Sequence, residues 1–295
     1  MDLVSVREFA AARGIAESAV RRLCAQGAIA GARREGRAWR LPARAAVPGL
    51  RPAADTPLLR ALREQREARS RGGIYHRTQI ELTFNSNHME GSRLSKEQTR
   101  YIFETNTIGA SGEAVRVDDV VETVNHFACV DYVIDHAAAP LTERLIKHLH
   151  AVLKRGTTDA AKAWFVVGGY KRLPNEVGGE ATTAPERVGA ELRDLLRGYN
   201  AKETVTLADI LDFHHRFETI HPFQDGNGRV GRLLMFKECL ACGIVPFVID
   251  ESLKMFYYRG LREWPRQRGY LTDTCLAAQD DYKALLDYFK IGYRR

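Results

Sequence analysis

Hydrophobic residues recur at helical spacing along most of the chain after a proline-rich stretch near residue 50. Thr142 is a typical helix N-cap, because the residues after it place their apolar side chains on one helix face. Leu141 before this cap and Ile146 after it have the spacing of a hydrophobic staple. Thr206 begins a second helix of the same kind, with an acidic residue three positions later. The pattern therefore predicts a mainly α-helical domain over residues 57–295.

Residues 164–183 interrupt this helical pattern. Two glycine pairs, at 168–169 and at 178–179, flank a short stretch of apolar and basic residues. Glycine pairs of this kind mark tight turns between strands. We therefore expect a small β-hairpin flap within the otherwise helical domain.

The N-terminal part of the chain has a different pattern, of two short helices followed by a hairpin. Ser5 and Glu8 have the spacing of a capping box, and Gly14 is the expected end of the helix that they begin. A second helix is predicted from about residue 17 to residue 26, and residues 29–41 can form a short hairpin. This order of elements resembles the winged helix-turn-helix of the excisionase and MerR type. We therefore expect a winged helix-turn-helix module at 1–45, followed by a proline-rich linker at 46–56.

Most of the net positive charge of the chain lies in this N-terminal part. Residues 1–56 hold ten arginines and five acidic residues, which is +5 of the net charge of +7 of the whole chain. A basic module of this kind predicts a polyanion as its partner, and the helix-turn-helix resemblance implies DNA. The alternative is a basic, solvated face on a protein-docking or dimerisation module. The expected DNA contacts lie on the second helix and the hairpin, at Arg21, Arg22, Arg33, Arg34 and Arg37.

Composition is typical of a globular protein, with 45% hydrophobic residues in a chain of 295. The sequence has no run of 18 apolar residues and no apolar segment of a secretory signal after its first charges. Its five cysteines are scattered and odd in number, which argues against a disulfide framework. We therefore expect a protein of a reducing, bacterial-like cytoplasm that has no membrane partner. Homo-oligomer formation is left open.

The richest chemistry lies in residues 221–232, HPFQDGNGRVGR. His221 is a candidate general base, and the proline after it prevents the preceding helix from continuing. Gly226 and Gly228 allow successive backbone N–H groups to point at one anion. A new helix is expected to begin near Arg229, so its positive dipole end would face the same place.

These residues resemble the signature of the Fic (filamentation induced by cAMP) family, H-x-F-x-[DE]-G-N-G-R-x-x-R, at all eight specified positions. The resemblance implies a Fic-type helical bundle in which His221 is the general base and Asp225 holds Mg²⁺. It implies that Asn227 and the backbone of its two flanking glycines cradle phosphates. It further implies that Arg229 and Arg232 offset charge on a triphosphate.

The reaction implied is attack of a protein Ser, Thr or Tyr hydroxyl on the α-phosphorus of ATP, which leaves AMP on a target protein or on the enzyme itself. Gly228 stands where a phosphotransferase-like relative of toxin systems has Lys, which favours adenylyl transfer. Two alternatives stay open: a DNA-binding transcriptional regulator with a Fic sensor domain, and a Fic transferase that uses another donor, such as UTP or CDP-choline.

A second motif lies upstream, at residues 86–91, SNHMEG. It matches the [ST]-x-x-x-E-[GN] pattern of the inhibitory helix of the family, which we expect near residues 80–91. The resemblance implies that Glu90 pairs with Arg232 and blocks the productive pose of the γ-phosphate. The same carboxylate could also position a water that removes AMP, as in some relatives.

Two further expectations follow from the family. The flap would clamp an extended target segment by strand addition, although an ordinary surface hairpin is the alternative. Tyr257 and Tyr258 stand where relatives place an aromatic ring against adenine, and core packing is the competing interpretation.

Overall fold

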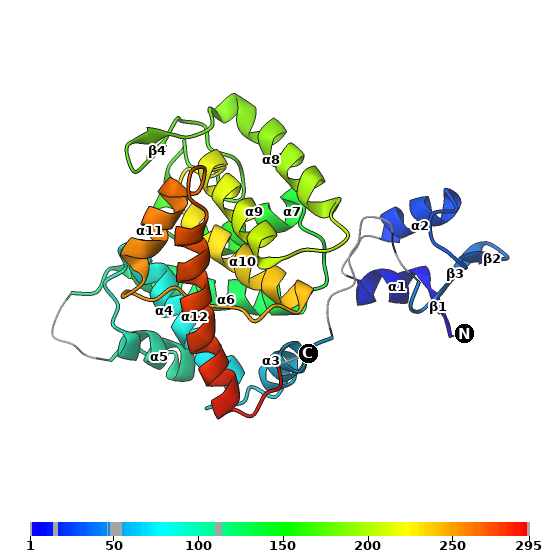
Figure 1. Ribbon diagram of the computed structural model, residues 1–295, viewed down its shortest axis with the longest axis horizontal. Helices are drawn as coiled ribbons and strands as arrows, with labels where there is room; N and C mark the ends of the chain where they lie inside the picture. The colour runs from blue at the N-terminus through cyan, green and yellow to red at the C-terminus, as the bar shows by residue number, and fades with distance from the viewer. Residues whose placement is uncertain (1, 14–16, 46, 48–54, 110–113, 294–295) are drawn as a thin grey trace.

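The computed structural model describes residues 2–13, 17–45, 47, 55–109 and 114–293. Figure 1 shows a large helical domain and a smaller N-terminal unit of two helices and three short strands. The prediction of a mainly α-helical chain is confirmed. Among the described residues, no helix combines the length and the apolar character that a membrane span requires.

The N-terminal unit contains β1 (Leu3–Ser5), α1 (Val6–Ala12), α2 (Glu17–Ala25), β2 (Arg33–Glu35) and β3 (Ala38–Pro42). The predicted capping box begins α1, because the Ser5 hydroxyl accepts from the Glu8 N–H at 3.2 Å and the Glu8 carboxylate accepts from the Ser5 N–H at 2.8 Å. The hairpin of β2 and β3 is present, and its buried side packs on both helices. The classification of this unit as a winged helix-turn-helix stays a prediction.

The hydrophobic pattern of the N-terminal unit missed one strand. β1 pairs antiparallel with β3, which gives a three-stranded sheet of order β1-β3-β2. Three residues are too few to display a strand period, so the tertiary pairing decides their conformation. Pro42, one residue beyond the predicted hairpin, pairs with Leu3 in this sheet, and Val47, which was expected in the linker, is buried in the same small core. Gly14 and positions 46 and 48–54 of the expected linker lie outside the described residues.

The large domain forms a helical bundle around a large hydrophobic core, with a small separate cluster of Leu94, Ile102 and Phe127. The N-caps predicted at Thr142 and Thr206 are confirmed, since each hydroxyl accepts from the N–H three residues later, at 3.1 and 3.3 Å. Its helices are α3 (Pro57–Glu67), α4 (Ile74–Met89), α5 (Lys96–Thr105), α6 (Val117–Asp135), α7 (Glu143–Lys154), α8 (Pro185–Asn200), α9 (Leu207–Ile220), α10 (Asn227–Cys242), α11 (Lys254–Glu263) and α12 (Gly269–Tyr288), with a 3-10 turn at Asp159–Ala161.

α10 lies at the centre of the bundle, against α9, α6, α7 and α4 (Figure 1). Thirteen of its sixteen residues are buried. A helix that is buried all round is fixed by its neighbours, so its N-terminus is held at a defined place among them. That N-terminus follows directly on the loop that carries His221.

The predicted flap is present as β4 (Glu176–Val177) and β5 (Glu180–Ala181). Gly178 and Gly179 form its turn with φ of 60° and 83°, which favours glycine at both positions. The strands are only two residues long, so most of residues 164–183 is a loop. Backbone hydrogen bonds from Lys171 to Pro222 and from Thr183 to Thr219 hold this loop beside the end of α9.

Candidate active site

His221 is positioned by the end of α9. It is the C-cap of that helix and has a left-handed backbone, with φ 49° and ψ 63°. Such a conformation is uncommon outside glycine and is often found at functional sites. Its Nδ1 lies 3.2 Å from the backbone carbonyl of Glu218. A carbonyl only accepts, so Nδ1 carries the proton and Nε2 is left as the basic nitrogen.

The protonation states around His221 follow from burial. Burial lowers the pKa of His221 to about 4, so the imidazole is neutral near pH 7 and can accept a proton. Glu218 Oε2 lies 3.8 Å from His221 Nδ1, and burial raises the pKa of this carboxyl to about 8. At neutral pH a protonated carboxyl therefore lies beside a neutral imidazole.

The loop between α9 and α10 is held by hydrogen bonds within the loop and by a buried aromatic side chain. Phe223 is fully buried and stacks on His150, with ring centroids 4.0 Å apart. Asn227 accepts from the N–H of Phe223 and donates to its carbonyl, each at 2.8 Å. Its side chain therefore shapes the loop, and a direct contact between Asn227 and phosphate stays a prediction.

The N-terminus of α10 is a candidate anion site. The helix begins at Asn227, two residues earlier than predicted, because Gly226 is its N-cap with φ 80°. Its first N–H groups have no partner within the helix and its dipole favours negative charge there. A Cβ on Gly228 would overlap Glu90 Oε1, so the Glu90 carboxylate already rests against this end of the helix. This carboxylate stands in for an anionic ligand.

Glu90 is the C-cap of α4 and forms the expected pair with Arg232. Arg232 NH2 lies 2.7 Å from Glu90 Oε1 and 2.9 Å from the carbonyl of Ser86, while its Nε donates to the Ser86 hydroxyl at 3.0 Å. Arg232 thus binds both ends of the upstream motif. The helix that carries Glu90 is longer than expected, since it begins at Ile74.

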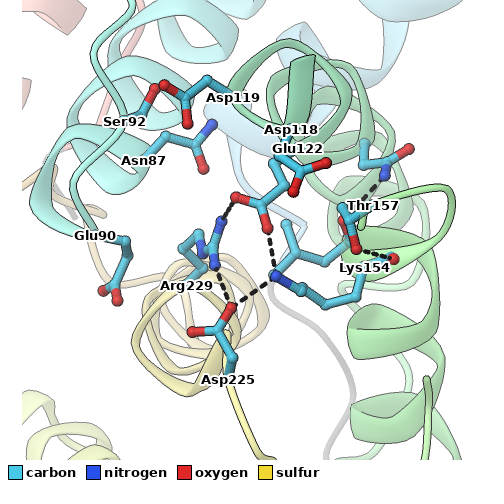
Figure 2. Close-up of polar contacts among 12 residues, drawn as sticks. Asn87, Glu90, Ser92, Asp118, Asp119, Glu122, Lys154, Thr157, Asp225 and Arg229 are labelled. Carbon is cyan, nitrogen blue, oxygen red and sulfur yellow. Dashed lines mark hydrogen bonds and ion pairs between the residues drawn. The ribbon is translucent and has the colours of Figure 1, made fainter. Parts of the chain in front are cut away.

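Asp225 and Arg229 are parts of an ion-pair network that Figure 2 shows. Asp225 Oδ2 lies 2.7 Å from Lys154 Nζ and 3.2 Å from Arg229 NH2. Burial alone would raise the pKa of Asp225, but the two cations outweigh it and lower that pKa to about 2. An ionised carboxylate is the ligand that Mg²⁺ prefers.

The guanidinium of Arg229 is enclosed. NH1 binds Glu122, NH2 binds Asp225, and the residue is only 3% exposed. Its Nε is buried without a partner among the residues that the structure describes. The side chain is thus already paired inside the protein, and the expected direct contact of Arg229 with a triphosphate stays a prediction.

The donor set fits a metal that arrives with a nucleotide. Within the described part of the chain, no group of three or more His, Cys, Asp or Glu side chains is placed to hold a metal ion. Mg²⁺ is commonly held by one or two carboxylates together with substrate phosphates and water. Asp225, whose side chain is 44% exposed beside the anion site, can supply the protein ligand of such a complex.

The two tyrosines considered for adenine differ in exposure. Tyr257 is 1% exposed and its hydroxyl is hydrogen-bonded to His214 Nε2 inside the core. Its side chain therefore packs in the core, which favours the competing interpretation, and a contact of Tyr257 with adenine stays a prediction. Tyr258 is 40% exposed, and its hydroxyl lies 3.4 Å from the carbonyl of Met89 beside Glu90. Tyr258 stays a candidate.

Three ionisable residues of this site were missed from the sequence: Glu122, Lys154 and Glu218. Lys154 has the appearance of an ordinary cation in the last turn of a helix, where the dipole favours one. Glu122 lies on a separate helix, and no spacing in the sequence relates it to residues 221–232. The position of Glu218, one helical turn before His221, was the only usable signal.

The five arginines that were expected to contact DNA are all exposed on the surface of the N-terminal unit. Arg21 pairs with Glu17 at 2.6 Å, Arg33 pairs with Glu35 at 3.1 Å, and the guanidinium of Arg34 lies over Trp39. The predicted DNA contacts are thus accessible, Arg22 and Arg37 included, and their role stays a prediction.

Comparison with protein families matches residues 140–239 to the Fic/DOC family. This part of the chain is thus similar to the Fic/DOC family. The matched part of the Fic domain runs from the N-cap of α7 through the flap and the His221 loop into α10. Glu90 and Glu122 lie before it in the chain.

The Fic domain is related to protein adenylyltransferases. It is 27% identical over 182 residues to "Protein adenylyltransferase fic-1" of Caenorhabditis elegans and 26% identical over 187 residues to "Protein adenylyltransferase Fic" of Drosophila melanogaster. These alignments cover 59% and 61% of this chain but 34% and 36% of the relatives. The matched region therefore spans about a third of the length of these curated relatives.

Solved structures share the fold. A Fic domain-containing signaling protein from Bacteroides thetaiotaomicron superposes with a TM-score of 0.59 at 26% identity, over 78% of this chain and 90% of that one. Fic-1 from C. elegans superposes with a TM-score of 0.60 at 19% identity, over 79% of this chain and 72% of that one. The match thus extends well beyond residues 140–239 into the rest of the helical domain.

Proposed function

We propose that this protein transfers AMP from ATP to a hydroxyl group of a target protein or of itself. The observation that carries the proposal is a neutral His221 whose Nε2 has no hydrogen-bond partner among the described residues, in the loop that leads into the candidate anion site at the N-terminus of α10. The target hydroxyl attacks the α-phosphorus, its proton passes to His221 Nε2, and pyrophosphate leaves. The N–H groups of α10 and Arg232 would hold the phosphates.

Asp225 would hold Mg²⁺, which offsets charge on the phosphates when it is bound. The flap lies beside the His221 loop, where it can pair with an extended segment of the target. This chain would thus supply the base, the metal ligand and the phosphate site, while the target supplies the hydroxyl. Use of another nucleotide donor is the alternative, because the residues at the base pocket set the donor.

We further propose that Glu90 restrains this activity. Its carboxylate rests where an anion would bind and is paired with the arginine that an anion needs. Negative charge at that place opposes a triphosphate through like-charge repulsion. The same carboxylate would be suitably placed to orient a water for removal of AMP.

The test is a Glu90→Gly variant incubated with a cell lysate, Mg²⁺ and a mixture of nucleotides. Mass spectrometry should detect AMP on a protein hydroxyl, at a level well above that of the parent protein. His221→Ala in the same background is the matched control and should abolish transfer. Unchanged labelling in Glu90→Gly would contradict the inhibitory role of Glu90. Transfer of a group other than AMP would identify a different nucleotide donor.

A second candidate role belongs to the N-terminal unit. The five exposed arginines named above support binding of DNA, which would locate the enzyme, and protein docking is the alternative. Five free thiols support a reducing compartment such as the cytoplasm.

A further inference from the structure

Glu122 and Lys154 complete a closed ring of alternating charges behind the phosphate site. The two oxygens of Glu122 bind different cations, Oε1 with Lys154 and Oε2 with Arg229. The same two cations meet again on Asp225 Oδ2. The four side chains come from α6, α7, α10 and the loop before α10, and Figure 2 shows them converging.

The two cations of the ring contact only Oδ2 of Asp225 and leave Oδ1 outside the ring. Both cations contact Oδ2, which fixes the rotation of the carboxylate. In Figure 2 the second oxygen points toward the side on which Glu90 lies. Because Glu90 rests at the anion site, this oxygen is directed to the place where a phosphate-bound cation would be.

Stability alone does not account for these charges. Lys154 is 2% exposed, and the side chains of Arg229 and Glu122 are 4% and 14% exposed. Removing charges from water is costly, and apolar side chains of similar volume often stabilise a protein equally well. A ring of charges does what apolar packing cannot, since it fixes the direction of a carboxylate.

We propose that Lys154 and Glu122 are positioning residues for Asp225 and that the ring presents Asp225 Oδ1 to a divalent cation carried by a nucleoside triphosphate. The inference rests on the proposed nucleotide site. Lys154 holds Asp225 directly, while Glu122 acts through Lys154 and Arg229. Arg229 belongs to the ring and orients the metal ligand, while Arg232 faces the anion.

The test measures how strongly Mg²⁺ tightens ATP binding. Isothermal titration calorimetry on the Glu90→Gly protein gives the ratio of ATP affinities with and without Mg²⁺. Lys154→Met and, separately, Glu122→Gln should lower this ratio by about tenfold or more, the usual effect of removing a partner that orients a metal ligand. The metal-free affinity for ATP should change much less.

Lys162→Met is the matched control. Lys162 pairs at 2.6 Å with Asp159, a carboxylate that Lys154 also contacts at 3.1 Å, and it lies outside the ring. The ratio of ATP affinities with and without Mg²⁺ should be the same for Lys162→Met as for the Glu90→Gly parent. Thermal unfolding measurements check that each variant folds. If Lys154→Met does not fold, Glu122→Gln, which preserves the side-chain volume, supplies the test.

Three results would overturn the proposal. An unchanged ratio in a folded Glu122→Gln protein means that the ring does not orient the metal ligand. An equal loss of affinity with and without Mg²⁺ in Lys154→Met means that Lys154 contacts phosphate itself. If Mg²⁺ does not tighten ATP binding to the Glu90→Gly parent, the proposed nucleotide site fails and the inference fails with it.

Discussion

At the scale of single residues, His221 combines a fixed tautomer with an unusually low pKa. Burial lowers this pKa from 6.5 to about 4, so the base form is present above that pH and is lost as the pH falls through it. A weak base is compatible with the reaction because the carbonyl of Glu218 holds the ring and supports the charge that forms on it.

The first prediction concerns the pH dependence of transfer. In the Glu90→Gly background, the initial rate of AMP transfer should stay flat between about pH 5 and about pH 7, because His221 is neutral throughout. An ordinary histidine would produce a rise near about pH 6.5. Rates measured with labelled ATP decide between the two, and an inflection near that value would contradict the low pKa.

The second prediction concerns Glu218. Its pKa in the folded protein, about 8, lies above the ordinary value of 4.5, so the folded protein keeps a proton that the unfolded chain releases. The free energy of unfolding therefore falls as pH rises from about 4.5 to about 8, by at most about 1.4 kcal/mol per pH unit. The glutamine in Glu218→Gln cannot ionise. The melting temperature of the variant minus that of the parent should therefore increase from about pH 5 to about pH 8. A difference that stays constant with pH would contradict the raised pKa.

The sequence identified the candidate site residues that belong to one contiguous motif, and the expected pairing of Arg232 with Glu90 is present. Lys154 and Glu122 could not be found, because their roles depend on a packing of α6 and α7 that no local pattern encodes. The burial of Tyr257 could not be predicted, because helical spacing does not separate a buried ring from an accessible one.

At the scale of elements, α4 is a part of the core as well as the carrier of Glu90. Eleven of its sixteen residues are buried. Thr78 is hydrogen-bonded to Tyr282 of α12 at 2.7 Å, and Thr83 to His126 of α6 at 2.9 Å. Detaching the helix would expose this whole face, so relief of the restraint should be confined to the end near Glu90.

The third prediction follows for hydrogen exchange. When the Glu90→Gly protein binds ATP and Mg²⁺, amides in residues 74–86 should stay as protected as in the parent protein. Changes should be limited to residues near 87–93. Mass spectrometry of exchanged peptides measures both, and loss of protection along all of α4 would show that the helix detaches.

Element boundaries were predicted best where a side chain marks them. Thr142, Thr206 and Ser5 cap helices as expected, because a capping hydroxyl is a local signal. α10 begins two residues earlier than predicted, because its N-cap is Gly226, which has no side chain to mark the boundary in the sequence. β1 was missed because only its pairing with β3 makes it a strand.

At the scale of the whole molecule, the chain has separate hydrophobic cores for the N-terminal unit and the helical domain. Val47 belongs to the first core, so a cut intended to remove that unit belongs after this residue. Separate cores allow one part to be removed without unpacking the other.

The fourth prediction is that deleting residues 1–47 from Glu90→Gly leaves AMP transfer intact and removes salt-sensitive retention of DNA. Replacing both Arg21 and Arg22 with Ala should lower the salt slope of binding by about two, because each arginine that neutralises a phosphate adds about one to that slope. Gel shifts at several salt concentrations measure this. A full-length protein that never shifts DNA at low salt would favour the docking alternative, which size-exclusion chromatography can examine.

The contact of Glu90 with the N-terminus of α10 has a consequence for how the protein would respond to its surroundings. A carboxylate held by the same chain is a tethered competitor, present at a local concentration that dilution cannot change. The apparent dissociation constant of a competing anion is its intrinsic value divided by the fraction of molecules in which Glu90 has moved away. Under the proposed restraint, the threshold for occupancy would therefore be set by the supply of free nucleotide and by any partner that shifts that fraction. It would be independent of how much of the protein the cell makes.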